Sequence, residues 1–284
     1  MNRAMDTGWN QAIPSIDAIR GASHSPSFSV DALHHGDTVT SKGFGYADKS
    51  TARVPNEEAI YSLGSYTKAF TATFVSLLVH SVQHDWTMTI PTSIPESQAP
   101  QNPAVGEKAT LPEILSHSTG LVSVLSVAIG RHGSAFPQRK DVTQICSNLP
   151  FVSPFRLEWQ YNNWPYALGS CLVDEISNKS WTQSVNEDFE LLGMNRRYTS
   201  EPYADANFAH AYTILSDGTA VEQETHSLQE GDAFNGSGST RSCGKDMMTW
   251  YKAMIEVSRA AFPAAEEGSE AASSVVSVLP GQLA

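Results

Sequence analysis

Cysteine is scarce in this sequence. Cys146, Cys171 and Cys243 are the only three among 284 residues, and no two of them have the Cys-x-x-Cys spacing of a metal or redox site. An odd count without a spacing framework argues against a disulfide-stapled secreted fold. Cys171 and Cys243 fit better as small apolar residues in or near packed helices.

Basic residues and long apolar runs are also few. Eighteen Lys and Arg stand against thirty Asp and Glu, which gives a formal net charge of -12. This sign disfavours nucleic acids and anionic membranes as partners, because both bind through a surplus of cations. The longest apolar candidate, 69–79, is shorter than the roughly 18 residues a membrane span needs. Residues 1–20 contain no apolar segment of the secretory type, so we expect a cytoplasmic protein.

Several motifs that would assign an enzyme class are absent. The sequence has no Walker-type phosphate loop, no Gly-x-Gly-x-x-Gly, no Gly-x-Ser-x-Gly and no His-Glu-x-x-His. These absences disfavour nucleotide binding, an α/β-hydrolase and a zinc hydrolase. The pair His34-His35 fits a solvated turn, because no further ligands follow at metal spacing. We therefore expect neither a metal nor a cofactor.

Hydrophobicity patterns predict a β-hairpin followed by helices. Alternation over 28–32, a turn over 34–37 and an extended segment over 38–46 predict the hairpin. Helical spacing of apolar residues predicts helices after Gly64 (with Phe70, Phe74, Leu77 and Leu78), over 111–115 (ending at 118–120), over 164–176 (with Asn163 as N-cap), over 181–192 (ending at Gly193) and over 246–257 (with Ser242 as cap). The order predicts an α+β protein with a small antiparallel sheet and a helical subdomain.

The segment from Gly64 to Lys68 places a Ser-x-x-Lys pair at the expected start of the first of these helices. Residues three apart share a helix face, so the Lys68 amine can reach the Ser65 hydroxyl. The positive end of the helix favours an alkoxide on Ser65 and a depressed lysine pKa, and a neutral lysine is a competent base for a serine. Two fixed residues recur by chance, and the alternative is a capping serine followed by a solvated lysine.

A second element with chemical potential is Tyr161-Asn162-Asn163. In an extended segment, positions i and i+2 point to the same side, so Tyr161 and Asn163 can face one cleft. A phenol beside an ammonium can shuttle a proton, and an amide can hold a substrate carbonyl and hydrogen-bond Lys68. The alternative is a turn tyrosine followed by a helix cap at Asn163.

Together, these motifs make the sequence resemble the serine β-lactamase and penicillin-binding-protein superfamily, in its class C and esterase branch. The resemblance runs from about residue 22 to about residue 258. The matching segments are 41–48, 61–72 with the Ser-x-x-Lys pair, 114–121, 161–163 followed by 166–169, 191–194 and 238–242. The Ser-x-x-Lys element is a signature of that superfamily, and several segments in register are far more specific than either catalytic motif alone.

The resemblance implies a β-lactamase/transpeptidase-like α+β fold and a role for each site residue. Ser65 would be the nucleophile that forms an acyl-enzyme. Lys68 and Tyr161 would share general base and acid work, and Asn163 would orient the substrate and Lys68. The family counterpart of His117 is structural and buried in the helical subdomain, which is the role we expect here. The implied partner is a small-molecule ester, amide or acyl donor.

One departure from the family concerns the C-terminal part. The family's third motif, Lys or His followed by Thr or Ser and then Gly, does not occur after Val257. We therefore predict a β-lactamase-like domain over 1–258, with its sheet part at about 22–64 and 235–258 and its helical subdomain at about 80–234. A non-homologous, disordered tail would fill 259–284. The late sheet strands would be missing, which predicts lower stability, weak activity and association with another chain through an uncovered sheet edge.

Two hypotheses about function follow. The first is a serine hydrolase or acyltransferase that acts through an acyl-Ser65 on a small-molecule ester or amide, with secondary metabolism as its setting. The second is a catalytically impaired relative that keeps the fold and binds a ligand or partner in the same cleft. The missing third motif favours the second, and the presence of Ser65, Lys68, Tyr161 and Asn163 together favours the first.

Overall fold

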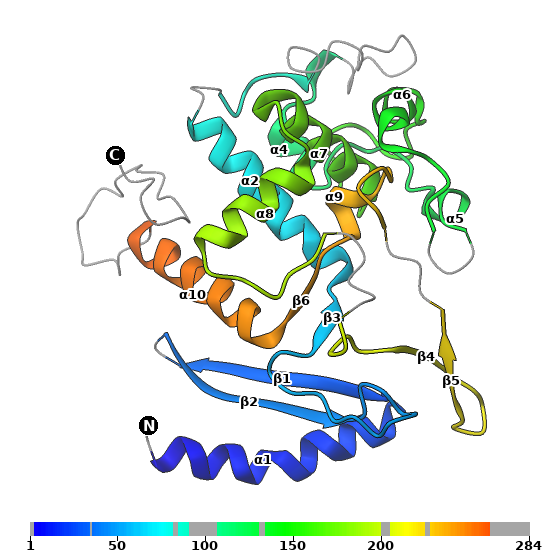
Figure 1. The fold of residues 1–284 in the computed structure, drawn as a ribbon. Helices are drawn as coiled ribbons and strands as arrows, with labels where there is room; N and C mark the ends of the chain where they lie inside the picture. Colours follow the sequence, from blue (N-terminus) through cyan, green and yellow to red (C-terminus); the bar gives the residue numbers. More distant parts are fainter. Residues whose placement is uncertain are drawn as a thin grey trace.

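Figure 1 shows the chain in a computed structural model. The structure describes residues 3–34, 36–81, 85–90, 107–130, 134–199, 205–224 and 228–261. The helices are α1 Arg3–Ala22, η1 Gly64–Tyr66, α2 Thr67–Ser81, α4 Leu111–Leu115, α5 Leu125–Ala128, η5 Arg139–Asp141, α6 Val142–Asn148, α7 Asn163–Ser177, α8 Trp181–Leu191, α9 Asn235–Gly238 and α10 Gly244–Ala261. The strands are β1 Ser27–His34, β2 Asp37–Gly45, β3 Ile60–Ser62, β4 Ala211–Ile214, β5 Ala220–Gln223 and β6 Arg241–Cys243.

The predicted N-terminal hairpin is confirmed. β1 and β2 pair antiparallel from Ser27 opposite Gly45 to His34 opposite Asp37. His35, in the predicted turn, lies outside the described residues. The hairpin lies between two helices, because α1 packs against β2 while α10 packs against β1 and β2 (Figure 1).

Helix α1 is an element that the sequence patterns did not predict. Its half-buried residues Trp9, Ala12, Ile13 and Ile16 follow the 3–4 spacing of a helix that covers a sheet. Pro14 stands inside the helix on its exposed side, and a proline within a helical pattern normally marks an end. The helical spacing of these four residues could have predicted α1, but Pro14 in the middle of the segment argued against a helix there.

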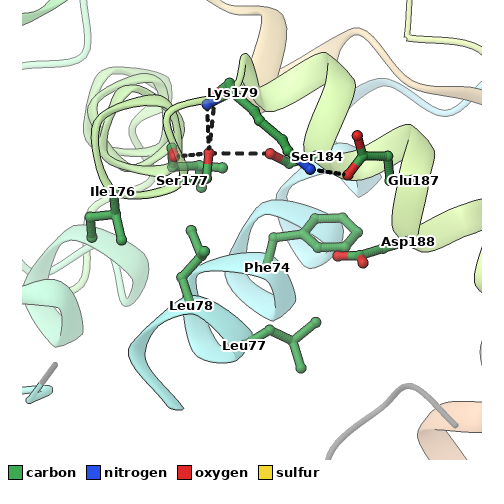
Figure 2. Close-up of a pocket in the computed structure, with 10 residues that line it drawn as sticks. Phe74, Leu77, Leu78, Ile176, Ser177, Lys179, Ser184, Glu187 and Asp188 are labelled. Atoms are coloured by element: carbon green, nitrogen blue, oxygen red, sulfur yellow. Dashed lines mark hydrogen bonds and ion pairs between the residues drawn. The ribbon is translucent and has the colours of Figure 1, made fainter. Parts of the chain in front are cut away.

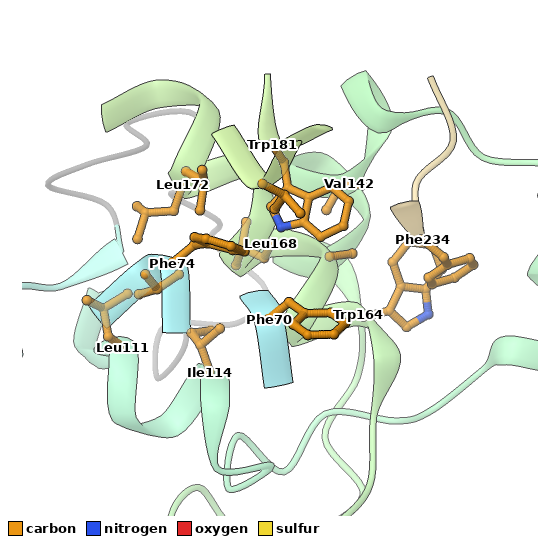
Figure 3. Close-up of a cluster of buried hydrophobic side chains, with 14 of the residues drawn as sticks. Phe70, Phe74, Leu111, Ile114, Val142, Trp164, Leu168, Leu172, Trp181 and Phe234 are labelled. Atoms are coloured by element: carbon orange, nitrogen blue, oxygen red, sulfur yellow. The ribbon is translucent and has the colours of Figure 1, made fainter. Parts of the chain in front are cut away.

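The helical part of the molecule is built around α2. Phe70 and Phe74 of this helix are buried, and they pack with Leu168 of α7 and Trp181 of α8 in the main core cluster (Figure 3). Ring contacts extend the cluster: the Phe70 centroid lies 4.7 Å from that of Trp250 in α10, with the rings near perpendicular. Edge-to-face pairs of this kind add specific geometry to the burial of apolar area. Helix α10 thus joins the helical part to the hairpin.

The predicted helices at 111–115, 164–176, 181–192 and 246–257 are all present. Thr110 and Glu113 form a capping box at the start of α4, and Ser180 accepts from the Gln183 N–H at the start of α8. Gly193 follows α8 with a φ of +76°, which is the left-handed turn that favours glycine there.

Two predicted caps are wrong. Helix α7 is capped by Asn162 rather than Asn163, because the Asn162 side chain accepts from the Trp164 N–H. Ser242 does not cap α10. It lies in β6, paired with Tyr61 of β3, and the helix begins at Gly244. The β3–β6 ladder places the segment before Ser65 beside the segment before α10.

The described ladders are β1–β2, β3–β6 and β4–β5, all antiparallel. With the surrounding helices they give the predicted α+β architecture. The predicted tail 259–284 begins within α10, which runs to Ala261, and residues 262–284 lie outside the described residues. No helix in the part of the chain that the structure describes is both long and apolar enough to cross a membrane.

Candidate active site

Ser65 stands in the 3₁₀ turn η1, immediately before α2. The strand β3 enters this turn, and the Leu63 N–H donates to the Thr240 carbonyl at 3.0 Å. Gly64 has a φ of +54°, a left-handed conformation that a side chain would strain. Thr67 stabilises the turn, because its hydroxyl donates to the Gly64 carbonyl and accepts from the Thr240 N–H. Ser65 is consequently held at the surface with its hydroxyl exposed.

Lys68 is buried one turn further along, at 6% exposure. Its Nζ lies 3.1 Å from Ser65 Oγ, 2.6 Å from Asn163 Oδ1 and 2.9 Å from the Ser237 carbonyl oxygen. A lysine ammonium has three N–H donors, and these three oxygens accept one each. The side chain is therefore fully satisfied by groups from η1, α7 and α9.

The arrangement determines what happens when Lys68 loses a proton. The carbonyl oxygens of Asn163 and Ser237 can only accept, so they keep the two remaining N–H donors. The lone pair of the neutral amine then faces the Ser65 hydroxyl, 3.1 Å away, and the Tyr161 hydroxyl, which also hydrogen-bonds Lys68. The hydrogen bonds from Lys68 to Asn163 and to the Ser237 carbonyl therefore orient the lone pair of the neutral amine toward the Ser65 hydroxyl proton.

The charge state of Lys68 is governed mainly by burial. Desolvation lowers the pKa of Lys68 below its usual value, and the interaction with Tyr161 opposes this shift. No carboxylate among the described residues forms an ion pair with Lys68. The ammonium is stabilised instead by the faces of Tyr161 and Tyr166, whose ring centroids lie 4.9 and 5.7 Å from Nζ.

Tyr161 places its hydroxyl group beside that of Ser65. Its Oη lies 2.5 Å from Ser65 Oγ and 3.4 Å from Asn163 Oδ1. Its side chain is 41% exposed, so the hydroxyl sits at the boundary between protein and solvent. The predicted alternation is present, because Tyr161 and Asn163 reach the site while Asn162 points into the protein. The four predicted side chains therefore share one site.

Asn162 supports the site from behind. It is buried, and its amide Nδ2 donates to the carbonyls of Leu121 and Val122 at 2.9 and 3.1 Å. Its Oδ1 accepts from the Trp164 N–H and so caps α7. Because Asn162 makes the cap, the Asn163 side chain remains available to Lys68.

Sequence reasoning missed the contribution of Ser237. Its backbone carbonyl is a direct acceptor for Lys68, and it belongs to the short helix α9, which packs against α2 and α7. Gly236 makes this packing possible, since a Cβ there would lie 2.1 Å from Ser170 Cβ. The Thr71 hydroxyl also donates to the Gly236 carbonyl at 2.6 Å. The available signal was the Gly236-x-Gly238 pair, which permits close approach of the backbone.

His117 is buried, at 8% exposure, as predicted for a structural residue. Its ring lies among those of Trp159, Tyr161 and Tyr166, with centroid distances of 5.6, 4.8 and 5.0 Å. Its Nδ1 accepts a hydrogen bond from the Asn162 N–H at 3.2 Å. His117 therefore contacts the segment that carries Tyr161, although no hydrogen bond joins it directly to Ser65 among the described residues.

Metal-binding and thiol chemistry find little support in the described part of the chain. Within it, no group of three or more His, Cys, Asp or Glu side chains could hold a metal ion. Cys146 and Cys243 are buried, and burial raises the pKa of Cys171 and Cys243 to about 11. Thiols with such values are protonated near neutral pH and are poor nucleophiles.

A hollow lies away from Ser65, between α2, α7 and α8 (Figure 2). It has a volume of about 300 Å³, and Leu77, Leu78 and Ile176 supply apolar walls. Lys179 and Glu187 form an ion pair on its rim, with Nζ and Oε2 2.6 Å apart. The lining contains no nucleophile paired with a base, so this hollow is not the candidate active site.

An exposed serine hydrogen-bonded to a buried lysine, with a tyrosine hydroxyl and an asparagine beside them, matches the Ser-x-x-Lys element that is a signature of the serine β-lactamase and penicillin-binding-protein superfamily. The chain belongs to this family: the Beta-lactamase family model matches residues 12–276. The family comprises serine hydrolases and acyltransferases, and the relatives of this chain include named hydrolases and penicillin-binding proteins.

Individual relatives are distant. An unguisins hydrolase from Aspergillus campestris is 27% identical over 82% of this chain and 44% of its own length. Penicillin-binding protein 4* from Bacillus subtilis is 22% identical over 83% of this chain and 54% of its own length. An octameric penicillin-binding protein homologue from Pyrococcus abyssi has the same fold, with a TM-score of 0.72 and 24% identity over 87% of this chain and 56% of that one. The chain thus spans about half the length of these relatives.

Proposed function

We propose that this protein is a serine hydrolase or acyltransferase that acts through an acyl-Ser65 intermediate on a small-molecule ester or amide, in secondary metabolism. The observation that carries the proposal is the Ser65–Lys68–Tyr161 arrangement, in which the Ser65 hydroxyl lies within hydrogen-bond reach of both the Lys68 amine and the Tyr161 hydroxyl. A nucleophile within such reach of a base is the geometric requirement for covalent catalysis.

Acylation would begin with proton transfer from Ser65 Oγ to the neutral Lys68 amine as Oγ attacks the substrate carbonyl carbon. The carbonyl π bond opens to an oxyanion. The Ser65 N–H, in the first turn of the helix, has no acceptor within that helix and can donate to this oxyanion. When the bond to the leaving group breaks, the proton on Lys68 returns through Tyr161 Oη to the departing oxygen or nitrogen. The products are acyl-Ser65 and a neutral alcohol or amine.

Deacylation would use the same groups in reverse. A water molecule or an alcohol loses its proton to the Tyr161–Lys68 pair and attacks the acyl carbonyl carbon. Ser65 Oγ leaves and regains the proton, which restores the free enzyme. Water gives hydrolysis and an alcohol gives acyl transfer, so the two activities differ only in the second nucleophile.

The surface beside Tyr161 supports a substrate with an apolar or aromatic group. Trp159 is 68% exposed, and its ring centroid lies 6.3 Å from that of Tyr161. Leu157 and Val152 are also exposed on the segment that leads to Tyr161, and residues 151–155 line an open cavity of about 370 Å³. Apolar side chains that gather at the surface mark binding sites. Two relatives are named as hydrolases of unguisins, which fits a small-molecule substrate.

The proposal is tested by covalent labelling. The purified protein is treated with a fluorophosphonate probe, and the modified residue is located by mass spectrometry. We expect the label on Ser65 and none on the Ser65→Ala variant, because Ser65 is the exposed hydroxyl that lies 3.1 Å from the Lys68 amine.

A chromogenic ester series with short, long and aromatic acyl groups then gives the substrate preference from kcat/KM. Labelling of the Ser65→Ala variant at the wild-type rate would refute the assignment of the nucleophile. A wild-type protein that resists the probe but binds these esters would favour the alternative of a catalytically impaired binding protein.

A further inference from the structure

His117 holds the backbone on both sides of Tyr161. Its carbonyl oxygen accepts from the Gln160 N–H at 2.8 Å, and its ring Nδ1 accepts from the Asn162 N–H at 3.2 Å. One residue thus binds the positions immediately before and after Tyr161. Its ring also lies against the Tyr161 ring, at 4.8 Å between centroids.

The backbone of His117 is in the left-handed conformation. Its φ is +60°, a region that is uncommon for residues other than glycine, although asparagine, aspartate and histidine are enriched there. Such a conformation persists when surrounding contacts hold it in place. Here the contacts are the two hydrogen bonds to the Tyr161 segment and the three aromatic rings around the imidazole.

The ring hydrogen bond requires a neutral histidine. The Asn162 N–H is a donor, so Nδ1 must offer its lone pair, and the proton of the neutral imidazole is then on Nε2. A protonated imidazole carries a proton on each nitrogen, so Nδ1–H would face the Asn162 N–H, donor against donor. Protonation therefore removes one of the two bonds that fix Tyr161.

We propose that neutral His117 is a positioning residue for Tyr161, and that its protonation displaces the Tyr161 hydroxyl from Ser65 and shuts off the reaction at acid pH. This inference rests on the proposed function of Ser65, Lys68 and Tyr161, and adds a second ionisation to it. His117 itself touches neither Ser65 nor the reacting atoms.

Several titratable or charged side chains lie on the elements packed around His117: Glu113 on α4, Lys68 on α2, Tyr166 on α7, and Arg156, Glu158 and Tyr161 on the segment before α7. Burial, followed by the positive charge of Lys68, lowers the pKa of His117 below its usual value. Glu113 is paired with Arg156, at 2.9 Å between Oε1 and Nε. His117 is therefore neutral at pH 7, and its effect arises only as the pH falls through its lowered pKa.

The test compares His117→Asn with His117→Leu. Asparagine tolerates the left-handed backbone and keeps an acceptor on a short side chain, but it does not titrate. Leucine offers no acceptor. His24→Asn is the matched control, because His24 also has a left-handed backbone, with a φ of +52°, and lies in the turn after α1. The kcat/KM for a chromogenic ester is measured from about pH 4 to pH 9, with circular dichroism at each pH to follow the fold.

In the wild-type protein, the Lys68–Tyr161 pair and His117 must each lose a proton. We therefore expect kcat/KM to fall with the square of the proton concentration below both pKa values. The His117→Asn variant should keep most of its activity at neutral pH, and its kcat/KM should fall only with the first power of the proton concentration. The His117→Leu variant should also fall with the first power but lose about 10²-fold at every pH, as expected when a catalytic group is misplaced. The His24→Asn variant should follow the wild type.

Two results would overturn the inference. One is a wild-type pH profile in the His117→Asn variant; the other is equal activity of the Asn and Leu variants at neutral pH. A readout without turnover separates this inference from the proposed function: in the Ser65→Ala protein, NMR follows the His117 Cε1–H and Tyr161 ring signals with pH. We expect both signals to shift with pH at the same midpoint. A Tyr161 signal that does not change as His117 titrates would also refute the inference. Failure of Ser65 to take the probe refutes only the proposed function.

Discussion

At the scale of single residues, the proposed chemistry depends on the hydrogen-bond partners of the buried Lys68 amine. Lys68 has three oxygen acceptors and no paired carboxylate among the described residues. A carboxylate would favour the ammonium and raise the pKa of Lys68, whereas burial lowers it. Because the folded-state pKa lies below the usual value, the neutral base is populated at lower pH than for an exposed lysine.

The Tyr161→Phe variant separates proton transfer from folding. Only a hydroxyl at the solvent boundary is removed, and the ring contacts with His117 and Lys68 remain. We expect kcat to fall about 10²–10⁴-fold, the usual contribution of a positioned acid or base, with little change in Tm. Ester hydrolysis and a circular dichroism melt measure the two quantities. A rate near that of the wild type would show that Lys68 works without Tyr161.

At the scale of elements, two adjacent asparagines at the start of α7 make different kinds of hydrogen bond. Asn162 caps the helix and binds two carbonyls in the interior, while Asn163 bonds to Lys68. The pair therefore offers matched substitutions in neighbouring positions of one turn.

We expect Asn162→Ala to cost about 1–2 kcal/mol of unfolding free energy, through loss of the cap and of partners for the Leu121 and Val122 carbonyls. Asn163→Ala should also cost stability, because the buried Lys68 amine loses an acceptor, but it should reduce labelling of Ser65 more than Asn162→Ala does. Urea unfolding and the rate of probe labelling distinguish the two effects. The reverse pattern would mean that Asn163 is the cap after all.

Helix α9 is an element of four residues whose Ser237 carbonyl accepts a hydrogen bond from Lys68. In Gly236→Ala, the new Cβ would meet Ser170 Cβ at 2.1 Å, so α9 would have to move away from α7. We expect a loss of about 1–3 kcal/mol in stability and slower labelling of Ser65, since the Ser237 carbonyl would move with it. Gly231→Ala is the control, because nothing lies within 4 Å of its Cβ. Equal behaviour of the two variants would contradict the proposed role of α9.

Short-range geometry explains which parts of the site the sequence could predict. Ser65 and Lys68 are three residues apart at a helix start, and Tyr161 and Asn163 are two apart in an extended segment, so local periodicity brings each pair together. The choice between Asn162 and Asn163 as cap depends on carbonyls 40 and 41 residues away, which no local pattern contains. The Ser237 acceptor is a backbone carbonyl, which every residue has, so residue type gave no signal.

At the scale of the whole molecule, a hairpin with helices on both sides is joined through α10 to a larger helical part (Figure 1). Within the described residues, β1 has a ladder partner on the β2 side alone. The predicted association through a sheet edge stays a prediction, as does the cytoplasmic location. Size-exclusion chromatography of the purified chain at several concentrations would test the association.

The stability of the molecule should depend on the ionisation of Asp188 in α8. Burial raises the pKa of Asp188 to about 6, and Figure 2 shows its side chain beside Phe74. A raised carboxyl pKa means that the folded state resists ionisation, so stability is lost as the pH rises from the unfolded value of 3.8 through about 6.

We expect Asp188→Asn to raise the unfolding free energy by about 1 kcal/mol at pH 7, and the gain to vanish at pH values below the unfolded pKa. Glu187→Gln is the control on the same helix, because its pairing with Lys179 lowers the pKa of Glu187 and reverses the sign. Urea unfolding at a series of pH values measures both variants. A gain for Asp188→Asn that is constant across pH would show that packing, rather than charge, is responsible.

The bond between Lys68 and the Ser237 carbonyl also has a meaning for how the chain folds. It joins residues 169 positions apart, so it cannot form until most of the polypeptide has been gathered around α2. Closing a loop of this length is slow compared with forming a helix. The proposed site around Ser65 is therefore assembled late, and covalent labelling of Ser65 would report that folding has finished. During refolding, helical circular dichroism should return first, and probe reactivity should follow with the slowest phase.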